Sequence, residues 1–173
     1  LWLTKPRATV TVTNELKRGV ATADEVAAAV ASMKALSRAA SRAALAAGAK
    51  AATDVTGFGL AGHALEMAEA SRVRFRFEWA SLPWLPGAQR LAQEMVFPGG
   101  AFNNSEHFGG RVAQARPLTD GESMLLFDPQ TSGGLLVAVP TGREADFARA
   151  LEEGGGRGTR VGEVVEGAGI EIA

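Results

Sequence analysis

The fold is decided by residues 51–63, which read AATDVTGFGLAGH. Residues 50–54 favour a short strand that ends at Asp54, and the apolar spacing of residues 60–70 predicts a helix. Hard divalent cations prefer oxygen ligands such as a carboxylate, and glycines let backbone N–H groups approach a phosphate at a helix N-terminus. The turn between strand and helix therefore predicts a metal ligand at Asp54 and a phosphate-binding loop beside it. The phosphate-loop candidates are Thr56, Gly57 and Gly59.

Two interpretations of Asp54 stay open from the residues alone, because Gly and Asp also form ordinary turns. The carboxylate either holds a cation, or it caps the following helix and accepts hydrogen bonds from loop N–H groups. His63 lies one helical turn further along. There, packing or a hydrogen bond to the backbone is favoured over catalysis.

The composition is that of an ordinary globular chain with one compact domain. Of the 173 residues, 46% are hydrophobic and 21% are charged, and no apolar run approaches the roughly 20 residues of a membrane span. The formal net charge of −1 gives no general attraction to nucleic acid. We therefore expect neither a membrane nor a nucleic acid as a partner.

Cysteine is absent, which excludes a disulfide, a thiolate nucleophile and a zinc–thiolate site within this chain. With two histidines only, oxygen-ligand metal chemistry is favoured over a histidine-rich site. A cytoplasmic location is expected. The first six residues, LWLTKP, contain no initiator Met and no signal-peptide pattern, so the chain reads as one entered partway through.

Alternation of apolar residues, helical periodicity and turn residues predict the secondary structure of the rest of the chain. Strands are expected at residues 8–13, 72–79, 123–127, 135–139 and 159–165. Helices are expected at residues 22–48, 88–95 and 143–151. The segment from residue 97 to about residue 120 is rich in turn formers and is expected to be a loop. Because strands and helices interleave without simple alternation, the expected fold is α+β, a mixed β-sheet layered with helices.

Two sets of basic residues lie on these elements, one on the helix expected at residues 22–48 and one on the strand expected at residues 72–79. The sets are Lys34, Arg38 and Arg42, and Arg72, Arg74 and Arg76. The first set recurs every four residues and forms one face of the helix, where solvation is favoured over phosphate contact. The second set lies on the solvent side of an alternating strand. Binding of an anion or a partner is the alternative there.

Two later segments supply candidates for a cleft. Residues 98–100, which read PGG, precede Asn104, and residues 127–136 read FDPQTSGGLL between two expected strands. Hydroxyls and backbone N–H groups there could hold an anion, although the same residues are ordinary turn formers. The cleft candidates are Asn104, Thr131, Ser132, Gly133 and Gly134. Because the chain has no G-x-x-x-x-G-K loop and no nucleophile paired with a base, we assign no catalytic residue to it.

Together, residues 53–63, 98–104 and 127–136 resemble selenophosphate synthetase, also called selenide, water dikinase, of the aminoimidazole ribonucleotide synthetase-like superfamily. The order and spacing of the three motifs match the C-terminal half of that family. Residues 3–6 and 16–19 are similar to the start of the same half, so the resemblance covers nearly all of the chain.

The resemblance implies that residues 1–173 are a single C-terminal domain of a two-domain enzyme whose N-terminal ATP-binding domain is absent from this sequence. The implied reaction converts ATP, selenide and water to selenophosphate, AMP and phosphate, with Mg²⁺ bridging the phosphates. It makes Asp54 a magnesium ligand. The nucleophile, the lysine, the glycine-rich loop and most of the ATP contacts belong to the other domain, and the implied full-length enzyme is a homodimer. The isolated chain is expected to be inactive.

The chain departs from the family pattern at three places. The usual Leu-Gly-Thr-Gly after Lys-Pro is replaced by residues 7–10, which read RATV; Asn is replaced by Ser37, and Thr by Ala101. Two other hypotheses therefore stay open. One is a non-catalytic domain of the same ancestry that binds a partner or an anion, and the other is a different ATP-dependent enzyme of the superfamily.

Overall fold

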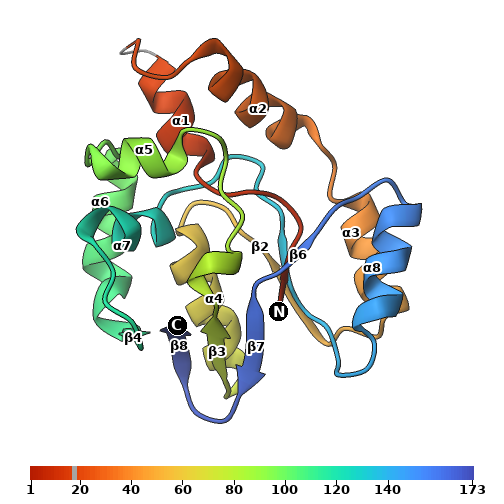
Figure 1. Ribbon diagram of the computed structural model, residues 1–173. Coiled ribbons are helices and arrows are strands. Elements are labelled where there is room, and N and C mark those ends of the chain that lie inside the picture. The colour runs from red at the N-terminus through yellow and green to blue at the C-terminus, as the bar shows by residue number, and fades with distance from the viewer. Residues whose placement is uncertain (17–18) are drawn as a thin grey trace.

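A computed structural model describes residues 1–16 and 19–173, and shows two four-stranded sheets with helices packed around them (Figure 1). The first sheet has the order β2-β5-β1-β6: Ala51–Asp54, Leu135–Ala138, Trp2–Leu3 and Thr159–Arg160. The second has the order β4-β8-β3-β7: Val112–Gln114, Gly169–Ile172, Arg74–Phe77 and Gly162–Val165. The α+β class is confirmed, with two sheets where one was expected. Residues 17–18, part of the segment 16–19 that resembles the family, lie outside the described residues.

Antiparallel pairing in the first sheet determines where the candidate motifs meet. Ala51 of β2 pairs with Ala138 of β5, and Asp54 pairs with Leu135. The C-terminal end of β2 therefore lies beside the segment that leads into β5. This register brings the turn after Asp54 next to residues 128–134, although the two are far apart in the sequence.

The second sheet is mixed, because β3 pairs antiparallel with β7 but parallel with β8. Its inner face is apolar: Phe75 and Phe77 of β3 are 1% and 0% exposed. Arg76 lies on the solvent side, as the alternation predicted, and its guanidinium is paired with Glu171 at 2.7 Å. At Gly162, which begins β7, an added Cβ would lie 2.0 Å from the Arg76 carbonyl oxygen. Only glycine lets the chain cross from one sheet to the other so closely.

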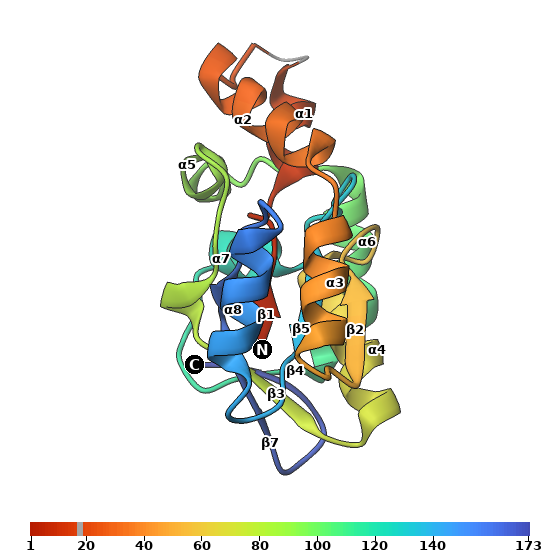
Figure 2. The same ribbon diagram turned by 90° about the vertical axis from the view of Figure 1, so that its right-hand side faces the viewer.

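The helices are α1 Thr9–Leu16, α2 Ala23–Lys34, α3 Arg38–Ala46, α4 Gly59–Ser71, α5 Ala88–Gln93, α6 Gly99–Phe108, α7 Asp120–Leu126 and α8 Glu144–Glu153. Three groups of buried apolar side chains hold them. The largest joins α4, α6 and α7 to both sheets. A second lies between the pair α3–α8 and β5, and a third joins α1, α2 and α5 (Figure 2). None of the helices in the described part of the chain has the length and apolar character needed to traverse a bilayer.

The strand expected at residues 8–13 is wrong, because Thr9–Leu16 forms α1. The alternation of threonine and valine resembles a strand, but residues distant in the sequence cap this helix, as described below. The single helix expected at residues 22–48 is also wrong. Ala35 ends α2 with an extended backbone at ψ 128°, so α2 and α3 are separate. The face expected to join Lys34 to Arg38 and Arg42 is therefore broken.

Four further expectations fail, all from residue 72 onward. The loop expected after residue 97 contains α6, and the strand expected at residues 123–127 belongs to α7. Thr119 and Glu122 form a capping box at the start of α7. This capping box stabilises a helix in a short apolar segment that otherwise resembles a strand. The strand expected at residues 159–165 is interrupted at Val161 and continues as β7, and β8 was missed. Arg72, expected in a strand, ends α4 in a left-handed conformation at φ 55°.

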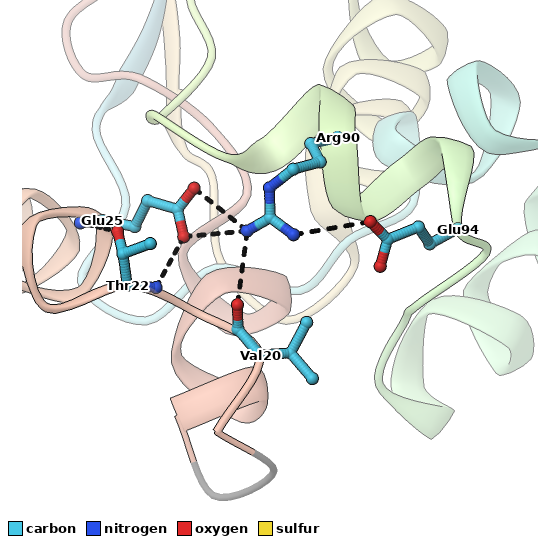
Figure 3. A network of polar contacts seen from close by, with 5 residues as sticks. All are labelled: Val20, Thr22, Glu25, Arg90 and Glu94. Atoms are coloured by element: carbon cyan, nitrogen blue, oxygen red, sulfur yellow. Dashed lines mark hydrogen bonds and ion pairs between the residues drawn. The ribbon is translucent and has the colours of Figure 1, made fainter.

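A polar network ties α2 to α5 (Figure 3). Glu25 Oε2 accepts hydrogen bonds from the Thr22 N–H at 2.8 Å and from Arg90 at 3.0 Å. Arg90 also lies 3.5 Å from the Glu94 carboxylate. The Thr22 N–H, and then Arg90, hold the pKa of Glu25 below its ordinary value of 4.5. The depressed pKa means that the ionised carboxylate stabilises the fold, and that this contribution is lost as the pH falls through that lowered pKa.

We predict that Glu25→Gln lowers the free energy of unfolding by about 1–2 kcal/mol at pH 7, because the charge-assisted bonds of the capping box and of Arg90 are lost. Denaturant unfolding at several pH values measures the effect. The difference from the wild type should shrink as the pH falls below 4.5. The exposed carboxylate of Glu106 provides the control, since Glu106→Gln should change stability little. A pH-independent loss for Glu25→Gln would contradict the electrostatic explanation.

Candidate functional site

Asp54 ends β2 with an exposed side chain. Its backbone is fixed by the pairing with Leu135, and the next residue continues the connection, because the Val55 N–H donates to the Gly134 carbonyl at 2.9 Å. Within residues 1–16 and 19–173, the Asp54 carboxylate has no hydrogen bond or ion pair. Helix α4 begins after Phe58, and no side chain caps it. The structure thus does not show the capping role that was the alternative for Asp54.

His63 holds the turn that follows Asp54. The Thr56 hydroxyl lies 3.1 Å from His63 Nε2, and the Phe58 N–H donates to the same nitrogen at 3.3 Å. Nδ1 lies 3.4 Å from the Glu66 carboxylate. Burial lowers the pKa of His63, against the opposing charges of Glu66 and Asp54. A neutral ring that accepts at Nε2 carries its proton on Nδ1, so His63 makes the backbone contact that the sequence favoured.

Two glycines let the candidate segments touch. A Cβ at Gly59, where φ is +71°, would lie 2.8 Å from the Leu126 carbonyl oxygen at the end of α7. A Cβ at Gly133 would lie 1.8 Å from the Val55 carbonyl oxygen. The Gln130 N–H also donates to the Thr56 carbonyl at 2.9 Å. The turn after β2 and residues 128–134 therefore form one close-packed unit with Asp54 at its edge.

The hydroxyl groups of Thr131 and Ser132 lie on the exposed side of that unit. In the described part of the chain they have no hydrogen-bond partner, although the backbone around them is well held. The Thr131 N–H donates to the Thr9 hydroxyl at 2.9 Å, and the Ser132 carbonyl accepts from Lys5 Nζ at 2.8 Å. With Gly57, which is also exposed, these groups remain able to contact a ligand.

Asn104 lies on a helix where a loop was expected, and its side chain bonds to backbone groups, which was the alternative to holding a ligand. It lies on α6, is 9% exposed, and donates through Nδ2 to the Gly57 carbonyl at 2.8 Å and the Phe127 carbonyl at 3.0 Å. Its amide therefore joins the turn after Asp54 to the end of α7. In this structure Asn104 supports the site from beneath and is not open to a ligand.

The sequence missed a buried polar cluster that fixes the start of α1. Asp128 Oδ1 accepts from the Thr11 N–H at 3.0 Å and the Thr11 hydroxyl at 2.6 Å, and Asp128 Oδ2 accepts from Gln130 Nε2 at 2.8 Å. Gln130 Oε1 in turn accepts from the Thr9 N–H at 3.2 Å. Burial raises the pKa of Asp128 to about 7, while these donors and Arg7 oppose the rise. The only local signal was an Asp-Pro-Gln segment, which reads equally well as a turn.

Arg7 lies beside this cluster and is 1% exposed. Its three guanidinium nitrogens have no hydrogen-bond partner among the described residues. Burial lowers the pKa of Arg7 to about 9, and the charge of Asp128 opposes the shift. A buried charge without hydrogen bonds is costly, so Asp128 is its main electrostatic compensation.

One carboxylate cannot hold a metal ion alone. The described residues contain no group of three or more His, Cys, Asp or Glu side chains placed to bind a metal. Asp54 fits Mg²⁺ as a single ligand, because it is an exposed oxygen donor with no competing partner. The remaining ligands would have to come from phosphates, water or another part of a protein.

Comparison with known proteins decides the family. The family model described as "AIR synthase related protein, C-terminal domain" matches residues 1–173. The chain belongs to this family. As an AIR synthase related C-terminal domain it is 42% identical over 166 residues to selenide, water dikinase of Pseudomonas aeruginosa, covering 96% of this chain and 47% of that protein. It is 44% identical over 165 residues to the selenide, water dikinase of Bordetella bronchiseptica, covering 95% and 47%.

The chain thus spans about half the length of the curated relatives it matches. Solved structures agree on the fold of this AIR synthase related domain. Thiamine-monophosphate kinase from Stenotrophomonas maltophilia has a TM-score of 0.66 at 16% identity, covering 99% of this chain and 48% of the other. The hydrogenase maturation protein HypE in complex with ATP has a TM-score of 0.58 at 16% identity, covering 95% and 42%. At such identities the likeness concerns the fold alone.

We predict that Asp128→Asn lowers the free energy of unfolding of this AIR synthase related domain by about 2–4 kcal/mol, because a buried acceptor is lost and Arg7 is left uncompensated. The loss should be smaller by about 1 kcal/mol in an Arg7→Leu background, where no buried charge remains. Denaturant unfolding of the four members of this double-mutant cycle measures both quantities. Equal losses in the two backgrounds would show that Arg7 and Asp128 are not coupled.

A second prediction concerns Asn104. Asn104→Leu leaves the carbonyls of Gly57 and Phe127 without their donor and should lower the free energy of unfolding by about 2–4 kcal/mol. Asn103→Leu is a matched control on the same helix, because Asn103 is exposed. Hydrogen exchange should also quicken at the backbone N–H of Gly59, which closes the turn. If the two variants were equally stable, Asn104 would not be the link described above.

Proposed function

We propose that this domain is the C-terminal domain of a two-domain selenide, water dikinase, and that the full enzyme makes selenophosphate, AMP and phosphate from ATP, selenide and water. The observation that carries the proposal is the unpaired Asp54 carboxylate, fixed at the end of β2 by the pairing of Asp54 with Leu135. The names of the relatives that match nearly all of the chain support it.

In this proposal the domain contributes one face of a composite site. Asp54 would hold Mg²⁺ through a carboxylate oxygen, and the bound metal would supply positive charge for the ATP phosphates. Thr131, Ser132 and the backbone around Gly57 contact phosphate oxygens through hydroxyl and N–H groups. His63 remains neutral and maintains the turn. Because this chain lacks cysteine, a thiol nucleophile has to come from the N-terminal domain. As the resemblance implies, that domain also supplies the other metal ligands and most of the ATP contacts.

The full-length enzyme is in this proposal a cytoplasmic homodimer, as the resemblance implies. Nothing in the ordering of the Asp54 turn requires a second subunit, since its hydrogen bonds come from α4, α6 and residues 128–134. The domain alone should therefore fold its part of the site but remain inactive, because it holds only one of the metal ligands.

The alternative of a partner-binding arginine face has less support. Arg76 is paired with Glu171 at 2.7 Å and lies 3.6 Å from Glu163, so its charge is already compensated. Arg74 donates to the Ala168 carbonyl at 3.2 Å. The other alternative, an ATP-dependent enzyme with a different acceptor, is distinguished by the acceptor: AMP must form only when selenide is supplied.

We predict that Asp54→Asn in the full-length enzyme lowers selenide-dependent AMP formation at least ~10- to 100-fold and raises the Mg²⁺ concentration needed for half-maximal rate, because an anionic ligand is lost. The rate is measured with selenide, ATP and increasing Mg²⁺. Asp24→Asn is the control, since Asp24 is also an exposed carboxylate but lies on α2. Normal turnover with unchanged Mg²⁺ dependence in Asp54→Asn would refute the assignment.

A further inference from the structure

A cavity of about 890 Å³ opens between α2, α3 and α8. The N-terminal residues Thr4 and Lys5 and the turn at Gly154 complete its wall. In Figure 2 the paired helices α3 and α8 lie side by side, with α2 above them. Cavities of roughly 300–1,000 Å³ are the usual size for small-molecule sites. Asp54 is not among the residues that line it.

All the charged side chains that line this cavity in the described part of the chain are positive. Its basic lining residues are Lys5, Arg38, Arg42 and Arg157, and no Asp or Glu belongs to the lining in the described part of the chain. The domain as a whole has a net charge of −1, so the positive charge is local. Converging positive charge in a concave wall attracts anions.

The three arginines of the cavity differ from most other arginines of the domain. Six arginines elsewhere pair with carboxylates within 4 Å, namely Arg76, Arg90, Arg111, Arg116, Arg143 and Arg149. Among the described residues, Arg7, Arg72, Arg74 and Arg160 also lack an ion pair, but none of them lines the cavity. Arg38, Arg42 and Arg157 have neither a hydrogen bond nor an ion pair from their guanidinium groups to any described residue. Planar guanidinium groups bind phosphate oxygens in pairs of hydrogen bonds, and here they are free to do so.

Lys5, a largely buried cation in the cavity wall, gives a second reason to expect an anion in this cavity. Lys5 is only 9% exposed, and its ammonium donates to the Ser132 carbonyl at 2.8 Å, but no carboxylate of the described residues pairs with it. Burial, and then the charge of Arg7, lower the pKa of Lys5. Arg7 itself is 1% exposed without a hydrogen bond. Arg7 is compensated by Asp128 and does not line the cavity, whereas Lys5 lines it without a carboxylate partner among the described residues. A ligand anion in the cavity would offset part of the cost of burying the Lys5 ammonium.

The rest of the wall is uncharged. Ala28 and Ala31 of α2 face the cavity together with Leu85 and Pro86, and the Ser32 hydroxyl is buried there without a partner. We propose that this cavity binds a phosphate ester, with the phosphate against Arg38, Arg42 and Arg157 and an uncharged body against α2. A phosphate monoester carries nearly two negative charges at neutral pH, which suits several cations better than a carboxylate does.

The proposal is independent of the dikinase activity, because the test needs neither Mg²⁺ nor ATP. Isothermal titration of the full-length protein with phenyl phosphate, and separately with inorganic phosphate, compares an ester with the free anion. Phenyl phosphate should bind several-fold more tightly. Arg38→Gln and Arg157→Gln should each weaken its binding roughly tenfold, because each removes charge-assisted hydrogen bonds. Arg160→Gln is the matched control: Arg160 is exposed, but it is not part of the cavity wall.

Three results would overturn the proposal. The first is a failure of phenyl phosphate to bind, and the second is a loss of binding in Arg160→Gln as large as that in Arg38→Gln. The third is binding of inorganic phosphate as tight as that of the ester. The first two would leave only general electrostatic attraction, and the third would assign the cavity to free phosphate. Thermal unfolding verifies that the variants are folded. A preparation that binds phenyl phosphate but makes no selenophosphate would refute the proposed function and leave this inference standing.

Discussion

The site depends on the hydrogen bonds by which the side chains of Asp128 and Gln130 hold the first turn of α1. Two side chains from one loop accept hydrogen bonds from the backbone of Thr9 and Thr11, more than a hundred residues away in the sequence. The same loop then fixes the turn after β2, through the bond from Gln130 to Thr56 and the contact of Gly133 with Val55. Asp54 is placed by this chain of contacts as much as by its own strand. An acceptor at the start of a helix is also favoured by the helix dipole.

The sequence predicted correctly the elements whose signals are local. Residues 50–54 and 60–70 became β2 and α4 nearly as expected, because strand residues, a glycine turn and helical periodicity follow one another directly. Residues 8–13 failed for the opposite reason. Alternating threonine and valine favour a strand, and only the distant Asp128 and Gln130 make a helix there. A short helix or strand is decided by tertiary contacts more than by propensity.

In the candidate site, too, the features that depend on local sequence were predicted, and those that depend on tertiary contacts were not. The exposed position of Asp54 and the backbone contact of His63 follow from local sequence, and the structure shows both. The position of Asn104 does not, because it depends on α6 packing across the turn and α7 at once. The two glycine-rich segments lie close together because β2 pairs with β5. Local sequence does not show that pairing, so only the family resemblance indicated that the segments are neighbours.

The three departures from the family pattern lie in different surroundings. Ala101 is fully buried in the main core, where a methyl group suits the packing. Ser37 lines the basic cavity, and Arg7 lies behind it, near Lys5. Ala8 adopts φ 79°, a left-handed conformation that costs a non-glycine residue about 1–2 kcal/mol. The start of α1 tolerates that strain because Gln130 and Asp128 hold the next residues. Of the departures, only Ser37 lines the basic cavity, whereas Thr9 is bonded to Gln130 and Thr131 and so belongs to the contacts that hold the turn after Asp54. That turn keeps its full motif although the segment that supports it differs.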